Sequence, residues 1–231
     1  MIFTYRDYNI TQDQMQEIIT KILNYVKTED LPLAGQRDWE YALPIYLADF
    51  NSNDVILDIG CGISYNFLYL SSIVEKSFGI DDIKNGCFDK WTVVWLKTLT
   101  HYDEYINGKA QFLNMNAKEL PFKDNYFTKI ITWSALEHFM GNDDILCAKE
   151  IYRCLKPGGI FLGSVDFNAD SEYPIPDNLD CRFYTHQSFL DRIVEPSGFE
   201  LVGKDYIKYG DPINMQTAIA ISLFFMLRKT L

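Results

Sequence analysis

Residues 55–62 read Val-Ile-Leu-Asp-Ile-Gly-Cys-Gly, and this stretch decides the fold. Its β-branched apolar residues predict a short buried strand, and the glycines at 60 and 62 predict a tight turn directly after it. Helical spacing follows over 65–74. A strand that turns through glycines into a helix brings Asp58 and the backbone of the turn to the carboxyl edge of a parallel sheet, where such folds bind ligands. A purely structural turn has the same pattern, so both interpretations stay open at this point.

Strand-like and helical segments alternate around this stretch, which predicts an α/β fold whose parallel sheet is covered by helices on both faces. Upstream, apolar residues at spacings of three and four predict an amphipathic helix over 11–27 with Thr11 as its N-cap. A second helix is predicted over 38–50, with Pro44 as a kink or a restart. The further predicted strands end at Asp81 and cover 110–115, 129–133 and 159–165.

The C-terminal part departs from this alternation. After a helix predicted over 187–194, strand-like runs cover 199–207 and 217–227, and the polar link between them is too short for a parallel crossover. We therefore expect an antiparallel hairpin. The sequence has no repeat or linker, so it predicts one domain over 1–231, with a helical cap at 1–50, a core at 51–231 and insertions at 84–108 and 168–184.

The composition is that of an acidic chain with a sizeable core. Of its 231 residues 48% are hydrophobic, and 32 acidic against 21 basic residues give a net charge of −11. Nucleic acids and anionic membrane surfaces are therefore poor partners. Five cysteines without a CxxC pair and three histidines fit neither a disulfide framework nor a metal site, and a reduced, cytoplasmic setting is expected. The longest apolar run, 218–227, is too short to span a bilayer.

A second acid strengthens the ligand-binding interpretation of the glycine turn. Asp81 ends the next predicted strand and follows Gly62 by 19 residues. In α/β nucleotide sites an acidic residue at about this separation accepts hydrogen bonds from ribose hydroxyls. A dinucleotide fingerprint would place a third glycine at position 65, where this chain has Tyr65, so a nicotinamide-dependent oxidoreductase is the weaker alternative.

Four segments together resemble the successive motifs of class I S-adenosylmethionine-dependent methyltransferases. They are VILDIGCG (55–62), FGID (78–81), NMNAKELPFKDNYFTKIITWSALEHF (114–139) and LKPGGIFLGSV (155–165). The likeness is nearest to the small-molecule group with Leu-Glu-His after the fourth strand. It implies a Rossmann-like sheet of seven strands, mostly parallel with an antiparallel C-terminal strand, S-adenosylmethionine as the cofactor and a soluble small molecule as the methyl acceptor. A non-catalytic partner protein that retains the cofactor fold is a further alternative.

The resemblance also implies roles for individual residues. Asp58, Gly60 and Gly62 line the methionine end of the cofactor, and Asp81 binds its ribose. Asn116 and Ala117 lie against the adenine, although Asn116 stands where the family commonly has Asp. Thr128 likewise replaces a common Asp, at a position that bears on packing. The implied cofactor site further includes Cys61, Asp82 and Trp133.

Arg37 and Glu40 lie just before the first core strand, in a segment that similar enzymes fold over the methionine end of the cofactor. Their charges match the carboxylate and ammonium groups there, and a guanidinium can bind a carboxylate in a bidentate manner. The alternative is a surface helix with Trp39 in the core.

Methyl transfer from a sulfonium is an in-line displacement, so the protein mainly aligns the acceptor and excludes water. For a hydroxyl acceptor, His138 is the first candidate for the base and Asp166 the second. A role of His138 in shape and hydrogen bonding is the alternative. Acceptor contacts are expected from the two insertions and from Arg182, and O-methylation of a sugar or glycan precursor is the preferred reaction. The oligomeric state is not predicted.

Overall fold

The computed structural model describes residues 10–26, 38–62, 64–82, 110–167, 181–202, 207–215 and 218–231, with only the backbone at 38–41 and 207–222. The predicted insertion at 84–108 and most of the one at 168–184 therefore lie outside the described residues.

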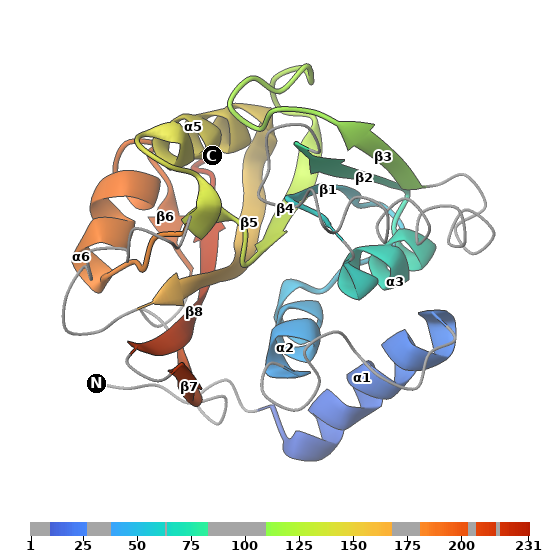
Figure 1. The fold of residues 1–231 in the computed structure, drawn as a ribbon. Coiled ribbons are helices and arrows are strands. Elements are labelled where there is room, and N and C mark those ends of the chain that lie inside the picture. Colours follow the sequence, from blue (N-terminus) through green and yellow to red (C-terminus); the bar gives the residue numbers. More distant parts are fainter. Residues whose placement is uncertain are drawn as a thin grey trace.

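One mixed sheet organises the described chain (Figure 1). Its strand order is β3-β2-β1-β4-β5-β8-β6, and β7 also pairs with β8. β8 runs antiparallel to its neighbours, whereas β1 to β5 pair in parallel. The predicted Rossmann-like fold class is thus confirmed. The strands are β1 (Val55–Ile59), β2 (Lys76–Asp81), β3 (Ala110–Asn114), β4 (Phe127–Trp133), β5 (Leu155–Phe167), β6 (Glu200–Leu201), β7 (Ile207–Met215) and β8 (Ala218–Arg228).

The C-terminal hairpin forms, but its first arm differs from the prediction. The segment predicted as one strand over 199–207 is split into β6 and the start of β7, which lie one after the other along the same edge of β8. The expected link at 208–212 belongs to β7, where the register with β8 shifts between Tyr209 and Ile213. Gly210 and Pro212 fall within that shift. A proline lacks the N–H that a ladder needs, so it is tolerated at an irregularity of this kind.

Helices cover both faces of the sheet, as predicted (Figure 1). One face packs against α1, α2 and α3, and the other against α5, α6 and the π-helical turn η3. A short 3₁₀ turn, η2, follows β4. The helices are α1 (Gln12–Val26), α2 (Asp38–Ala48), α3 (Tyr65–Ile73), η2 (Leu136–His138), α5 (Asp143–Cys154), α6 (His186–Phe189) and η3 (Leu190–Val194). None of the helices in the described ranges is both long and apolar enough to cross a bilayer.

The ends of the first two helices have local causes. Thr11 caps α1 as predicted, because its Oγ1 accepts from the backbone N–H of Gln14 (3.2 Å) while Gln14 Oε1 accepts from the N–H of Thr11 (2.8 Å). α2 continues through Pro44 and ends before Asp49, whose φ of +47° is left-handed. α2 is therefore two residues shorter than the predicted 38–50.

Thr128 has a structural role at the amino ends of β1 and β4. Its Oγ1 lies 2.7 Å from Asp54 Oδ1 and 3.1 Å from the backbone nitrogen of Val55. The other oxygen of Asp54 pairs with Lys129 Nζ at 2.5 Å. These contacts join the two central strands at the edge opposite the glycine turn.

The packing of β4 against β5 yields a test of the fold. A Cβ atom built on Gly163 would lie 1.9 Å from the backbone oxygen of Thr132, so Gly163→Ala should force the central strands apart and lower the free energy of unfolding by about 3 kcal/mol or more. Gly141→Ala is the control, because its φ is +59° but no atom lies within 4 Å of the added Cβ. Its expected loss is about 1–2 kcal/mol. Urea unfolding measures both, and equal losses would contradict the close approach of the strands.

Candidate functional site

The glycine turn after β1 lies against the turn after β4. Gly60 and Gly62 have φ values of +66° and +40°, which L side chains rarely adopt. A Cβ on Gly60 would also lie 2.5 Å from the Cβ of Ala135. Between the two glycines, the backbone N–H of Cys61 donates to the carbonyl oxygen of Ile80 (3.0 Å), which ties the turn to β2. The ends of β1, β2 and β4 therefore meet at one place, as the motif predicted.

Asp58 is a buried acid near the end of β1. Its side chain has no solvent exposure, and neither carboxylate oxygen has a hydrogen-bond partner among the described residues. Burial raises its pKa well above the ordinary value, the nearby hydroxyl of Ser64 opposes this rise in part, and the negative charge of Asp81 adds to it. A buried carboxylate without donors is unfavourable unless a ligand supplies them.

Asp81, at the end of β2, is joined directly to the glycine turn. Its Oδ2 accepts from the backbone N–H of Gly62 at 3.0 Å. Burial raises the pKa of Asp81, and the N–H groups of Gly62 and Asp82 oppose this by stabilising the carboxylate. The positive charge of His138 also lowers the pKa of Asp81, which brings the segment after β4 within electrostatic range of the acid.

Asn116 and Ala117 follow β3 on a segment that is held to α5. Asn116 is exposed, and its Oδ1 accepts from the backbone N–H of Lys118 (2.9 Å), which leaves lone-pair capacity on that oxygen. Ala117 is buried in the core. Lys118 Nζ pairs with Asp143 Oδ2 at 2.7 Å. The predicted adenine position is thus a well-anchored turn.

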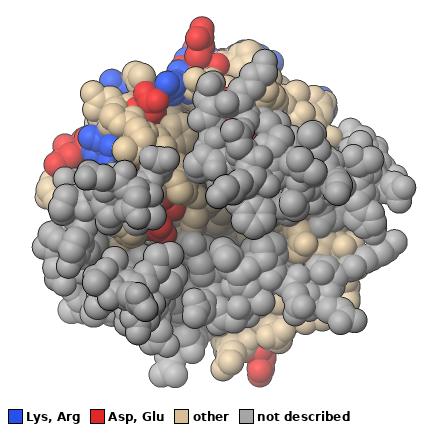
Figure 2. Space-filling model, in the orientation of Figure 1, with Lys and Arg blue, Asp and Glu red and all other residues tan. Residues whose placement is uncertain are grey.

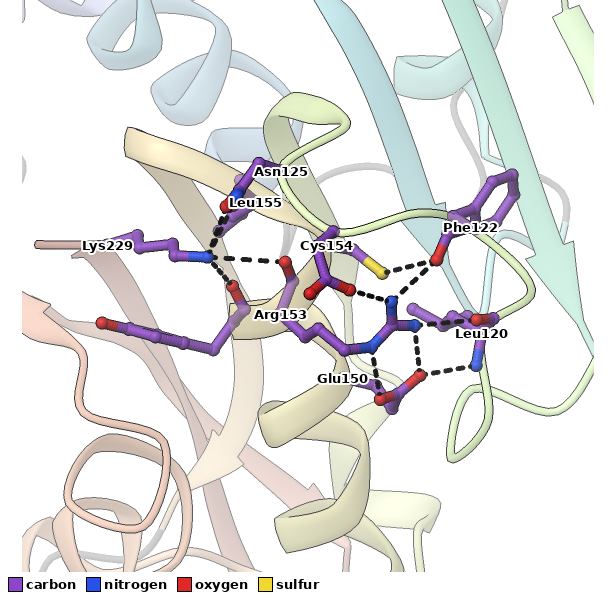
Figure 3. Close-up of polar contacts among 10 residues, drawn as sticks. Leu120, Phe122, Asn125, Glu150, Arg153, Cys154, Leu155 and Lys229 are labelled. Atoms are coloured by element: carbon purple, nitrogen blue, oxygen red, sulfur yellow. Dashed lines mark hydrogen bonds and ion pairs between the residues drawn. The ribbon is translucent and has the colours of Figure 1, made fainter. Parts of the chain in front are cut away.

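Figure 3 shows the second anchor of this segment, centred on Arg153 of α5. Arg153 Nη1 and Nη2 donate to the carbonyl oxygens of Phe122 and Leu120, each at 2.8 Å. Glu150 Oε2 bonds to both Arg153 Nη2 (2.7 Å) and the N–H of Leu120 (2.8 Å). An arginine with this many fixed acceptors orders the loop that follows the predicted adenine residues.

Trp133 ends β4 on the face covered by α2 and α3. Its Nε1 is buried without a partner among the described residues, and so is Oγ of Ser164, its neighbour in register on β5. The next residue, Ser134, has a φ of +45°. Asp166 lies on the same face as Ser164, two residues further along β5, and its carbonyl oxygen accepts from the N–H of Tyr184 (3.0 Å).

His138 lies in η2, directly after the contact between Gly60 and Ala135. It is partly exposed, whereas Glu137 beside it is fully buried. The structure thus brings Asp58, the glycine turn, Asp81 and His138 to one edge of the sheet. Figure 2 shows acidic side chains set back near the middle of this face, and mixed acidic and basic side chains over α5 at the upper left.

The side chains of two expected site residues are not among those that the structure describes. Arg37 is outside the described residues, and Glu40 is described only as backbone in α2. Arg182 does not fit the expected role as an acceptor contact, because its guanidinium pairs with Asp144 Oδ2 at 2.5 Å. Asp144 and Ala135, which shape the turn after β4, were missed by the sequence analysis.

Cysteines and metal-ligating groups add no second site in this part of the chain. Cys61, Cys147, Cys154 and Cys181 are buried, where free thiols pack as small apolar side chains. Among the described residues, no group of three or more His, Cys, Asp or Glu side chains is arranged to hold a metal ion.

Comparison with known proteins relates this chain and its fold to methyltransferases. Residues 57–163 match the family described as "Methyltransferase domain". Among solved structures, a putative methyltransferase from Bacillus halodurans has a TM-score of 0.63 at 16% identity and covers 83% of this chain and 99% of its own. The [4+2]-cyclase SpnF has a TM-score of 0.66 at 17% identity and covers 94% of this chain and 95% of its own. In sequence and fold the chain is thus similar to S-adenosylmethionine-dependent methyltransferases.

Curated relatives of this chain have different acceptors in their names. Cycloartenol-C-24-methyltransferase 1 of Oryza sativa is 28% identical over 138 residues, which are 60% of this chain and 36% of the relative. A ubiquinone/menaquinone biosynthesis C-methyltransferase of Neisseria gonorrhoeae is 27% identical, and the match covers 78% of this chain and 80% of the relative. The first three relatives are covered over 36%, 52% and 28% of their lengths, so the chain spans about a quarter to a half of them.

S-adenosylmethionine is the cofactor of this family, and the residues present fit it. The buried oxygens of Asp58 lack donors, which an ammonium group supplies. A Cβ on Gly62 would lie 4.0 Å from Asp81 Oδ2, so a glycine there keeps space open beside the acid.

The burial of Asp58 predicts that Asp58→Asn stabilises the ligand-free protein. At neutral pH an amide is buried more favourably than a carboxylate, so the free energy of unfolding should rise by about 1 kcal/mol, or about 2–4 °C in Tm. Because the pKa of Asp58 is raised in the folded state, folded wild-type protein binds a proton more readily than unfolded protein and gains stability as the pH falls. The variant's advantage should therefore disappear toward pH ~4.

Thermal melts of the two proteins between neutral and acidic pH measure this difference. Asp124→Asn is the control, because its carboxylate is 67% exposed and pairs with Arg153 at the surface. An Asp58 variant that is less stable than wild type at neutral pH would show that the buried carboxylate has donors after all.

Proposed function

We propose that this protein transfers the methyl group of S-adenosylmethionine to a soluble small molecule at the carboxyl edge of the sheet. The observation that carries the proposal is Asp58, a fully buried carboxylate whose oxygens make no hydrogen bond of normal geometry among the described residues, beside a glycine turn that is bonded to Asp81. When bound, S-adenosylmethionine supplies a methyl group activated on a sulfonium. The protein's own residues bind the cofactor, orient the acceptor and exclude water.

The methionine end of the cofactor belongs beside Asp58, Gly60, Cys61 and Gly62. An ammonium group near Asp58 satisfies a carboxylate that the fold otherwise buries unpaired. Arg37 and Glu40 remain proposed partners for the carboxylate and ammonium, since they precede or begin α2, which packs on this face.

The nucleoside end belongs beside Asp81, Asp82, Asn116 and Ala117. Asp81 uses one oxygen to accept from Gly62, and a carboxylate has further lone pairs for ribose hydroxyls. Register places Asp81 beside Asn114, two residues before Asn116, so the ribose and adenine contacts come from neighbouring strand ends. Tyr65 at the first position of α3 supports this cofactor over a dinucleotide, whose fingerprint has glycine there.

The acceptor belongs next to His138, Trp133 and Asp166. An imidazole is a side chain that can act as a base near neutral pH, and His138 lies within electrostatic range of Asp81. Trp133 Nε1 and Ser164 Oγ are buried donors without partners among the described residues, so a polar group of the acceptor or of the cofactor fits there. Asp166, on the same face, is the second candidate base.

The acceptor is proposed to be a small molecule that loses a proton from the atom that is methylated. The comparisons give no support to the expected sugar. The curated relatives reported above are C-methyltransferases, so both carbon and oxygen are proposed as the atom that is methylated. The net charge of −11 disfavours polyanionic acceptors. A cytoplasmic location is inferred from cysteines without a paired spacing.

Cofactor binding tests the first half of the proposal. Protein freed of co-purified ligand should bind S-adenosylhomocysteine in calorimetry, and Asp81→Ala should weaken binding by about 1–3 kcal/mol, or about 5- to 150-fold, because charge-assisted hydrogen bonds are lost. Asp124→Ala should bind like wild type, since Asp124 is a surface acid. NAD should give no thermal protection. Absence of S-adenosylhomocysteine binding by wild type would refute the proposed function.

Turnover tests the second half. On an acceptor found by screening phenols, hydroxy acids, sugars and enolisable carbonyl compounds, His138→Ala should lower kcat by about 10²–10⁴-fold while cofactor affinity stays unchanged, because a positioned base contributes about that much. His186→Ala is the matched control, because His186 is an exposed residue in the first turn of α6. Equal turnover by the His138 variant and wild type would remove His138 as the base.

A further inference from the structure

Asp144 is a fully buried carboxylate in the first turn of α5, and it accepts five hydrogen bonds, four from side chains and one from the backbone N–H of Ile145 to Oδ1 (2.9 Å). Its Oδ2 accepts from Arg182 Nη1 (2.5 Å), Arg192 Nε (2.8 Å) and the hydroxyl of Tyr184 (2.8 Å). Its Oδ1 accepts from Arg192 Nη2 (2.7 Å). Burial and Asp144 both raise the pKa of Tyr184, which therefore remains a phenol that donates. The side-chain donors belong to Arg182, Tyr184 and Arg192, which lie 38 to 48 positions later in the chain than Asp144.

The same three donor residues also hold carbonyl groups of the turn over 136–141. Tyr184 donates to the oxygen of Leu136 (3.3 Å). Arg182 donates through Nη1 to Phe139 (3.4 Å) and through Nη2 to Gly141 (2.9 Å). Arg192 Nη2 donates to the oxygen of Gly141 as well.

A main-chain bond completes the attachment of this turn. The backbone N–H of Arg182 donates to the carbonyl oxygen of Glu137 at 2.7 Å. Carbonyl groups at four positions of the turn, 136, 137, 139 and 141, are thus bound by residues 182, 184 and 192. A single turn of 3₁₀ helix has few bonds of its own, so these contacts determine where it lies.

The attached turn contains Glu137 and His138, and its first neighbour is the glycine turn. Ala135, one residue before η2, is the residue that a Cβ on Gly60 would meet. The charge of His138 reaches Asp81. The Asp144 cluster, defined as Asp144, Arg182, Tyr184 and Arg192, therefore holds the turn that contains Glu137 and His138.

We propose that Asp144 is a positioning residue, which acts through Arg182, Tyr184 and Arg192 to set the position of the Glu137–His138 turn relative to the bound cofactor. This inference rests on the proposed function. Breaking a buried ion pair leaves charges without partners, so loss of the Asp144 charge also releases both guanidinium groups from the turn. The cofactor residues on β1 and β2 make no contact with the cluster in the bonds described, so their affinity for the cofactor is retained.

The test uses the imidazole of His138 as a reporter. With three histidines in the chain, the Cε1–H resonance of His138 is assigned by its loss in His138→Ala. Saturating S-adenosylhomocysteine should shift this resonance in wild type. In Asp144→Asn the shift should fall to half or less, with the affinity for S-adenosylhomocysteine within about twofold of wild type. On an acceptor that wild type methylates, kcat should drop at least tenfold while KM for S-adenosylmethionine stays the same.

Two further variants keep the test decisive. Tyr184→Phe removes the hydroxyl bonds to Asp144 and Leu136 but keeps the ring, and it should show a smaller loss in the same direction if Asp144→Asn does not fold. Asp191→Asn is the matched control, because this exposed acid lies next to Arg192 and bonds to Gln187. An unchanged His138 shift and unchanged kcat in Asp144→Asn and Tyr184→Phe would overturn the inference. Loss of S-adenosylhomocysteine binding by wild type would instead overturn the proposed function.

Discussion

The contact between the turn after β1 and the turn after β4 is the constraint on which the rest of the site depends. Gly60 has no side chain, and the space that a Cβ would take is filled by Ala135. Through this contact the carboxyl ends of two adjacent parallel strands approach so closely that Asp58, Asp81 and His138 come to one edge. A larger residue at position 60 would separate the turn after β1, which is proposed to bind the cofactor, from the turn after β4, which leads to His138.

Three buried aspartates show how the fold treats a charge that it must hide. Asp54 has Lys129 and Thr128, and Asp144 has two arginines and a tyrosine. Asp58 is as deeply buried as Asp144, but its oxygens make no hydrogen bond of normal geometry among the described residues. Since the first two acids are neutralised by the chain itself, the third is the one left for a ligand to complete. That contrast distinguishes a structural acid from a binding acid more clearly than burial does.

Much of the fold could be predicted because its signals are local. The run at 55–62, the N-cap at Thr11 and the apolar strands depend on periodicity within a few residues, and they lie where the sequence placed them. The split of the predicted 199–207 strand could not be foreseen, because it depends on where β6 and β7 each pair along β8. The Asp144 cluster was missed for a similar reason. In the sequence Arg182 is a cation with no evident partner, and only the fold brings it to an acid 38 positions earlier in the chain.

The place of β8 in the sheet has a consequence for how the protein is made. β8 is the last strand in sequence among the described residues, yet it lies between β5 and the β6–β7 edge and pairs with β5 from Phe167 to Ile160. While the ribosome is still adding residues 218–228, β5 presents an unpaired edge rich in apolar side chains, the kind of edge that joins other chains. The sheet therefore closes after translation has passed its final strand, and a chain that stops short of β8 is exposed to aggregation rather than merely less active.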